Sequence, residues 1–459
     1  MNRQTNFHHI PDSVLLHIFN FLSRHELAIA AQVSKRWLRI SRDGALWKHM
    51  ELESKEENDV KDIITKNSCS LLTRMNLSKC NLTPEFMTLD ARLLRGNSAF
   101  VLRLLRCTPN VEMLAVDETI GSSWNGKILR LLSKLRLLDL SRCIEVTDED
   151  VEIMANSCPS LESLLLIKCF KVSGYALPVL LRNCKMLRTL SLAYTRVTDD
   201  CLRECNWKNS TLKELDFSSC YFVSSRGLKV VFANLSDAVY INLSNCSENS
   251  AVTPNILSDM MRFRSLQVLN LDDGFVTSEA NEDLICQIAH NCPYISCLLV
   301  GITLQTARCL ERCLQSLEDL KRFGISAYPG IDDPPLVRPP IPVAIPPNGF
   351  GLDKILNTLA TYCHKLEALQ LSGYRDRECE TVTNAFVNLL RNCENLSRIC
   401  SFGGNTDILV MAADAQQQTR RHDIRLIKPT MLTIDDPWRG PFVYEVQRNR
   451  RFWIENAYE

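Results

Sequence analysis

A short pattern of apolar and polar positions recurs along most of this chain. In LRLLDLSRC, LESLLLIKC and LKELDFSSC, which begin at Leu135, Leu161 and Leu212, apolar residues occupy positions one, four and six, and cysteine occupies position nine. Weaker or variant copies begin at residues 72, 111, 187, 238, 266, 295, 320, 366 and 396. Between residues 111 and 320, successive copies start 24 to 29 residues apart. Because positions four and six lie on the same side of an extended chain, each copy predicts one strand.

Five of the predicted strands are followed by a signal for the start of a helix. In five copies a valine and then a hydroxyl residue come after position nine, where the hydroxyl can accept a backbone N–H of the first helical turn. These predicted caps are Thr147, Ser173, Thr198, Ser224 and Thr277. One strand and one helix cannot bury an apolar face alone, so the units must stack into a curved α/β solenoid with strands lining one side. The period and pattern resemble the cysteine-containing leucine-rich repeats, over roughly residues 68–405.

Two spacings exceed the period. The copies at 72 and 111 are 39 residues apart, which indicates an irregular first repeat or an unrecognised turn, and those at 320 and 366 are 46 apart. The second interval contains segment 328–348, in which eight of 21 residues are proline. Such a segment forms neither a helix nor a central strand, so we expect a loop inserted into one repeat. The alternative is a polyproline ligand for an SH3-like domain, since Pro339 and Pro342 satisfy the PxxP spacing.

The pattern ends at about residue 405. The segment AADAQQQTRRHD, residues 412–423, predicts a loop. Aromatic residues are dense in residues 437–459, which argues against a fully disordered tail. We expect residues 406–459 to cap the open end of the solenoid, with contact to a partner as the alternative.

Charge and cysteine spacing narrow the possible functions. The 459 residues carry 53 Lys and Arg against 53 Asp and Glu, so there is no electrostatic case for general nucleic-acid or membrane-surface binding. No apolar run reaches the roughly 18 residues of a membrane span. The 20 cysteines include no CxxC pair, which disfavours zinc ribbons and thioredoxin-type motifs. Eleven fall on two fixed repeat positions and are predicted to be small buried hydrophobes: Cys69, Cys80, Cys143, Cys158, Cys169, Cys184, Cys220, Cys246, Cys292, Cys363 and Cys393.

The N-terminal stretch IPDSVLLHIFNFL, residues 10–22, has too many apolar residues for a surface helix. Either it is buried inside its own domain or its second face binds a partner. Residues 10–50 resemble an F-box, through the Ile10-Pro11 start, the apolar series that follows it, and the VSKRW and LWK elements. Ile10 replaces the usual leucine, and Ser13 stands where an acidic residue is common. The resemblance implies a small helical domain that binds a Skp-type adaptor through Ile10, Pro11, Val14, Leu15, Ile18, Phe19, Leu22, Leu27 and Trp37.

The order of the two parts is similar to that of the substrate receptors of Skp–cullin–F-box ubiquitin ligases. The implied domains are a helical F-box at 1–50, a linker at 51–67, about twelve leucine-rich repeats at 68–405 and the C-terminal segment. The resemblance implies a non-catalytic subunit that joins an adaptor and its cullin core to an unknown protein target, in the cytoplasm or nucleus. A non-degradative scaffold or a plain leucine-rich-repeat binding protein is the alternative. No catalytic motif, metal-ligand spacing or cofactor-binding motif is present, so we expect no cofactor.

Strand alternation places positions five, seven and eight of each copy on the concave face of the solenoid. Among them, basic residues come early in the chain and acidic residues come later, with a tyrosine between. We therefore expect a target to contact both charged groups, through Arg142, Lys168, Tyr194, Asp216, Asn242, Asp272 and Asp273.

Overall fold

The computed structural model describes residues 10–51 and 132–427 with gaps, the longest of which is 327–351, and between them residues 74–76, 112–115 and 129–130. It divides into two compact units. The first comprises Met1–Val172 with Ala176–Leu187, and the second comprises Ser173–Tyr175 with Arg188–Glu459.

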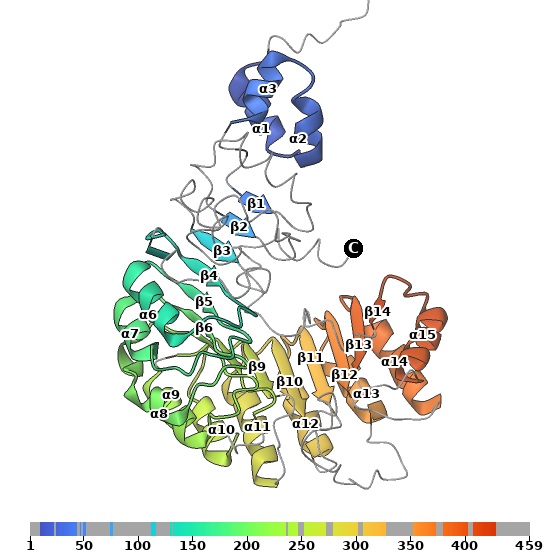
Figure 1. Ribbon diagram of the computed structural model, residues 1–459. Coiled ribbons are helices and arrows are strands. Elements are labelled where there is room, and N and C mark those ends of the chain that lie inside the picture. Colours follow the sequence, from blue (N-terminus) through green and yellow to red (C-terminus); the bar gives the residue numbers. More distant parts are fainter. Residues whose placement is uncertain are drawn as a thin grey trace, which may run out of the picture. The chain divides into compact units, whose positions relative to one another are not determined.

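The first unit joins three N-terminal helices to five strands in chain order (Figure 1). Its helices are α1 (Asp12–Phe19), α2 (Arg24–Ala30), α3 (Lys35–Ser41), α6 (Asp148–Ser157) and α7 (Leu177–Asn183). Its strands are β1 (His49–Glu51), β2 (Arg74–Asn76), β3 (Met113–Ala115), β4 (Leu137–Asp139) and β5 (Ser163–Leu165). Each strand pairs in parallel with the next. Parallel pairing of strands this short requires a crossover between each pair, as a repeat supplies.

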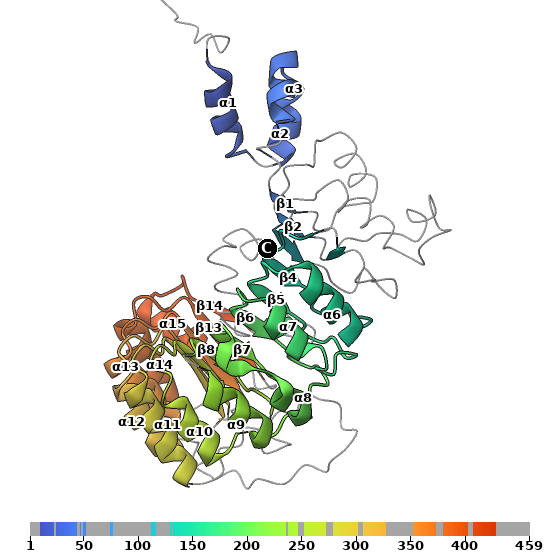
Figure 2. The same ribbon diagram turned by 90° about the vertical axis from the view of Figure 1, so that its left-hand side faces the viewer.

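The second unit continues the same alternation, with strands along one side and helices along the other (Figures 1 and 2). The strands are β6 (Thr189–Ser191), β7 (Glu214–Asp216), β8 (Tyr240–Asn242), β9 (Val268–Leu271), β10 (Cys297–Gly301), β11 (Arg322–Ser326), β12 (Ala368–Ser372), β13 (Arg398–Phe402) and β14 (Arg425–Ile427). The helices are α8 (Asp199–Glu204), η7 (Trp207–Asn209), α9 (Ser225–Asn234), α10 (Pro254–Met260), α11 (Glu279–Asn291), α12 (Thr306–Gln315), α13 (Leu352–Tyr362), α14 (Glu380–Asn392) and α15 (Asp407–Thr419). The leucine-rich-repeat architecture predicted from the sequence is confirmed.

Strand register explains both long intervals. Arg74 of β2 pairs with Met113 of β3, and Arg322 of β11 pairs with Ala368 of β12. The extra residues therefore do not interrupt the ladder, as predicted for an insertion into a repeat. The proline-rich segment 328–348 itself lies outside the described residues, so the SH3-ligand alternative stays open.

The repeat ladder is longer than the sequence pattern indicates. β1 begins at His49, inside the segment assigned to the F-box and its linker, and β14 ends at Ile427, beyond the predicted limit of 405. The loop predicted for 412–423 was wrong, because α15 runs to Thr419. Alanine and glutamine are good helix formers, and α15 buries one apolar face: Ile408, Met411, Ala412 and Ala415. Residues 428–459 lie outside the described part of the chain, and the predicted cap there stays a prediction.

Three of the five predicted helix caps are confirmed. Thr147 forms a capping box with Asp150, Thr198 accepts the Cys201 N–H at 3.4 Å, and Ser224 accepts the Arg226 N–H at 3.2 Å. The prediction for Ser173 was wrong, because α7 begins four residues later with Ala176 as its N-cap and a proline in its first turn. Thr277 lies outside the described residues.

The repeat cysteines occupy the core, as predicted for those the structure describes. Position-nine thiols also serve as weak donors to the preceding repeat: Cys169 Sγ lies 3.1 Å from the Leu140 carbonyl and Cys246 Sγ lies 3.0 Å from the Phe217 carbonyl. Burial raises the pKa of the Cys246 thiol to about 12. A neutral buried thiol fills space and satisfies a carbonyl, but it is a poor nucleophile or metal ligand.

Candidate protein-binding surfaces

The N-terminal helices form a small bundle with its own apolar core. α1 and α2 each pack on α3. The buried side chains are Leu15, Phe19, Leu27, Ala30 and Ile40. Partly buried residues pack against them: Ile10, Leu16, Leu22, Trp37 and Leu46. The Phe19 and Trp37 rings meet edge to face, with centroids 5.1 Å apart. The bundle therefore accounts for one face of the unusually apolar first helix.

The second apolar face of α1 is exposed. Val14 and Ile18 are 45% and 44% exposed, and Phe21, just beyond the end of the helix, is 75% exposed. Together with the exposed Pro11 they are spaced three or four residues apart, so they lie along one side. An apolar strip of this kind on so small a domain is typical of a protein interface.

Arginines of α3 hold the start of α1 in place. Arg36 Nε donates to Asp12 Oδ1 at 2.7 Å, and Arg36 Nη2 donates to the Ile10 carbonyl. Arg39 makes a further ion pair with Asp12. The hydrogen bond from Arg36 is the main reason that the pKa of the Asp12 carboxyl is lowered below its usual 3.8. These bonds fix the orientation of the first turn of α1, and with it the exposed strip.

The nine residues predicted to bind an adaptor fall into three groups. Exposed residues are Pro11, Val14 and Ile18. Partly buried residues that pack on the core are Ile10, Leu22 and Trp37. Core residues, at most 4% exposed, are Leu15, Phe19 and Leu27. The assignment of this last group to a contact surface is corrected, because their side chains are already covered by the bundle itself.

Exposed apolar residues of the bundle also include three that the sequence analysis did not select. They are Phe21, Ile29 and Val33, exposed by 75%, 53% and 60%. The three-and-four spacing from Val14 and Ile18 could have found Phe21. Ile29 and Val33 follow no such signal, because the short second helix carries too few turns to show a periodicity.

Polar side chains at the strand ends of the second unit close turns. The Asp216 carboxylate accepts the Ser218 N–H at 2.9 Å and the Ser191 hydroxyl at 2.9 Å. The Asn242 amide oxygen accepts the Ser244 N–H at 3.0 Å. Asp216 and Asn242 are only 3% and 2% exposed. Both form Asx-type turns that end a strand, so the prediction that they contact a target is corrected.

Position eight of the repeat has a left-handed backbone. The φ angles are 69° at Arg142 and 61° at Lys168 in the first unit, and 56° at Tyr194, 55° at Ser219 and 55° at Asn245 in the second. Non-glycine residues rarely adopt this region, so its recurrence marks a turn shared by these five repeats. Because the chain has left the strand at this position, these side chains lie at the loop edge of the repeats and not on the strand face where alternation places them.

The remaining residues predicted to bind a target belong to both units, so their contact with a single target stays a prediction. Arg142 and Lys168 are adjacent, since the Arg142 N–H donates to the Ile167 carbonyl at 2.6 Å, and both are half-buried at the loop edge. Tyr194 is half-buried at the loop edge of the second unit. Asp272 and Asp273 lie outside the described residues, so the acidic half of the predicted contact stays a prediction.

Comparison with known proteins matches both parts of the chain. Residues 7–53 match the family model described as F-box-like, and residues 208–231 match the model described as Leucine Rich repeat. The chain combines an F-box-like domain with leucine-rich repeats. Among the described residues there is no group of three or more side chains that could hold a metal ion. In the same part of the chain, no helix is long and apolar enough to cross a membrane.

Several curated relatives have the same two-part organisation in their names. F-box/LRR-repeat protein 5 of Bos taurus is 23% identical over 247 residues, which cover 48% of this chain and 36% of the relative. F-box/LRR-repeat protein 12 of Homo sapiens is 27% identical over 327 residues, covering 62% and 94%. Coronatine-insensitive protein homolog 1a of Oryza sativa subsp. indica is 26% identical over 486 residues, covering 89% and 75%. The match thus spans about a third of the length of the first of these relatives.

A solved structure shares the fold over nearly the whole chain. The crystal structure of the Rad7 and Elc1 complex in yeast aligns with a TM-score of 0.51 and 15% identity, covering 91% of this chain and 92% of that one. At this identity the likeness shows the fold alone.

Proposed function

We propose that this protein is the substrate-recognition subunit of a Skp–cullin–F-box ubiquitin ligase. The observation that carries the proposal is an F-box-like domain with an exposed apolar strip, joined to leucine-rich repeats. The strip supplies a surface for a Skp-type adaptor, and the repeats supply a separate surface for a target protein. The relatives named F-box/LRR-repeat proteins support the same reading.

A receptor of this type performs no bond chemistry. Its two modules hold the ligase core and the target at once, so the target's lysines meet the ubiquitin carrier at a high effective concentration. The buried cysteines are consistent with this role, since their raised pKa keeps them protonated. A scaffold that binds the adaptor without directing degradation is the alternative.

The adaptor surface is tested by placing charges on the exposed strip. Val14→Glu with Ile18→Glu leaves the bundle core untouched, because both side chains are nearly half exposed. In a complex, each carboxylate would be buried without a partner, which costs about 3 kcal/mol or more. We expect the double variant to lose co-purification with a co-expressed Skp-type adaptor by more than about 100-fold.

The matched control is Tyr294→Glu with Tyr362→Glu, which puts the same two charges on residues of the repeats that are 63% and 41% exposed. It should keep the adaptor. Undiminished adaptor binding by the double variant would refute the assignment of the strip. The scaffold alternative is separated by a second measurement: the half-lives of bound proteins lengthen on depletion of a degradative receptor and are unchanged on depletion of a scaffold.

A further inference from the structure

Three consecutive loops of the second unit, each just before a helix, are held against one another by close packing and hydrogen bonds. We call the residues that make these contacts locked positions. Gly174 has φ of 97°, and a Cβ built there would lie 3.2 Å from Val197 and Cys201 side-chain atoms. In the next pair of loops, the Asp199 carboxylate accepts the backbone N–H of Ser224 at 2.8 Å and its hydroxyl at 2.5 Å. The loops are thus fixed before any partner arrives.

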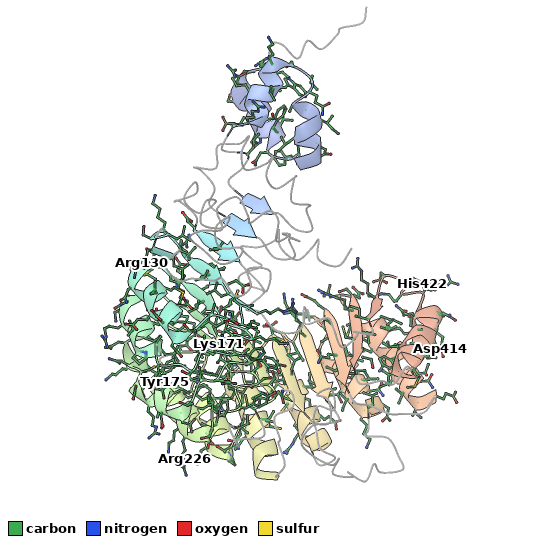
Figure 3. All side chains as sticks on the ribbon, in the orientation of Figure 1. Arg130, Lys171, Tyr175, Arg226, Asp414 and His422 are labelled. Carbon is green, nitrogen blue, oxygen red and sulfur yellow. The ribbon has the colours of Figure 1, made fainter. Side chains whose placement is uncertain are left out.

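Four exposed side chains lie on these loops or in the first turn of the following helix, each within two residues of a locked position. Tyr175 is 70% exposed and Phe222 is 57% exposed, while Arg196 and Arg226 are also exposed. Tyr175 and Arg226 are labelled in Figure 3. We call these four residues the edge patch. All of them belong to the second unit.

The charge of the edge patch is positive. Among the carboxylates at the start of α8, Asp200 pairs with Arg203, and Asp199 accepts two hydrogen bonds from Ser224, which hold it in place without removing its charge. Within the described residues neither Arg196 nor Arg226 has a salt bridge. Tyrosine, phenylalanine and arginine are enriched in the buried centres of protein interfaces. Rigid loops also lower the entropy lost when such side chains are ordered on binding.

We propose that the edge patch binds an acidic segment of the target, in which carboxylates flank an aromatic or aliphatic residue. The apolar residue would pack on Phe222 and Tyr175, and the carboxylates would accept hydrogen bonds from the two guanidinium groups. The strand face offers fewer polar groups to a partner, because a polar side chain such as Asp216 is buried in a turn there. The site rests on the proposed function only in taking the partner to be the ligase target.

The test uses the full-length protein and a displayed library of random short peptides. Selection on the wild-type chain should enrich peptides that combine Asp or Glu with an adjacent aromatic or aliphatic residue. Arg196→Glu with Arg226→Glu should weaken the enriched peptides about tenfold and shift new selections toward Lys and Arg. Phe222→Ala should weaken the same peptides about tenfold without changing the charge preference.

The charge control is Lys208→Glu with Lys354→Glu, which changes the same net charge at two exposed lysines of η7 and α13, outside the edge patch. It should leave the selected motif unchanged. The proposal is overturned if no acidic and apolar motif is enriched, if the edge-patch variants bind the peptides like wild type, or if the control weakens them equally. Adaptor binding is measured on the same preparations, so its absence would refute the ligase role and leave the peptide site standing.

Discussion

The two-faced first helix predicts opposite phenotypes for neighbouring alanine substitutions. Leu15 is 1% exposed and packs in the bundle core, whereas Ile18 is 44% exposed and faces solvent. Leu15→Ala removes a buried side chain and leaves a cavity, which costs about 3 kcal/mol. Ile18→Ala removes a half-exposed side chain, so its effect on stability should be within about 0.5 kcal/mol.

The first of these costs is decisive because the bundle is small. A single core of this size rarely supplies more than about 3–5 kcal/mol. Leu15→Ala should therefore leave the N-terminal helices largely unfolded in the free protein. Ile18→Ala should keep them folded and weaken adaptor affinity about tenfold, which corresponds to about 1.4 kcal/mol.

Hydrogen exchange and calorimetry separate the two effects. Exchange across residues 10–46 should become fast in Leu15→Ala and stay slow in Ile18→Ala, while exchange in the repeats is unchanged in both. Titration with the adaptor measures the affinity of each variant. Protected helices in Leu15→Ala, or full adaptor affinity in Ile18→Ala, would show that the division of α1 into a core face and a binding face is wrong.

Substitutions at three further positions test contacts of the bundle and the repeats. Gly227→Ala would bring a Cβ to 2.4 Å from Asp199 Oδ1 and disturb its bonds to the next loop, so urea unfolding should show a loss of about 2 kcal/mol. Arg421→Ala should lower the free energy of unfolding by about 2–4 kcal/mol and speed hydrogen exchange at the end of α14, because the guanidinium donates to four backbone carbonyls there at 2.9–3.4 Å. Arg421→Lys should not restore the stability, since lysine lacks the forked geometry of the guanidinium. Because the pKa of Asp12 is lowered in the folded state, its contribution to stability is fully present above about pH 3.8, the usual pKa. That contribution is lost as the pH falls through the pKa of the folded state. Asp12→Asn should remove this acid-dependent part of the melting temperature of the N-terminal helices.

The repeat architecture could be predicted because most units carry the same pattern of apolar residues. Leu138, Leu164, Leu190 and Leu215 occupy position four of successive copies and are all buried. This pattern is lost at the ends of the repeat array. β14 pairs in register with β13, yet its copy of the pattern has Asp423 at position one and Lys428 at position six, where other copies have apolar residues. The strand forms there nevertheless, because its backbone pairs with β13 and α15 packs against both strands.

The two faces of α1 could not be separated from the sequence. Both carry apolar residues at helical spacing, and periodicity alone does not say which one meets α3. The ion pairs from Arg36 and Arg39 to Asp12 decide it, since they orient the first turn so that Leu15 and Phe19 face inward. These contacts join residues that are 24 and 27 positions apart, so no local sequence pattern predicts them.

Asp216 and Asn242 were assigned to the target-binding face for a related reason. Alternation along a strand predicts where a side chain points only while the chain stays extended, yet β4, β7 and β8 end at position five. The signal was present in the sequence: an Asp or Asn at position five with Ser two residues later recurs in DLS, DFS and NLS. Such a pair closes an Asx turn, as at Asp139, where the carboxylate accepts the Ser141 N–H at 3.0 Å. The recurring polar residue is therefore a structural part of the repeat. Residues that vary between repeats at the loop edge, such as Arg196 and Phe222, have no such structural role and are therefore better candidates for contact with a partner.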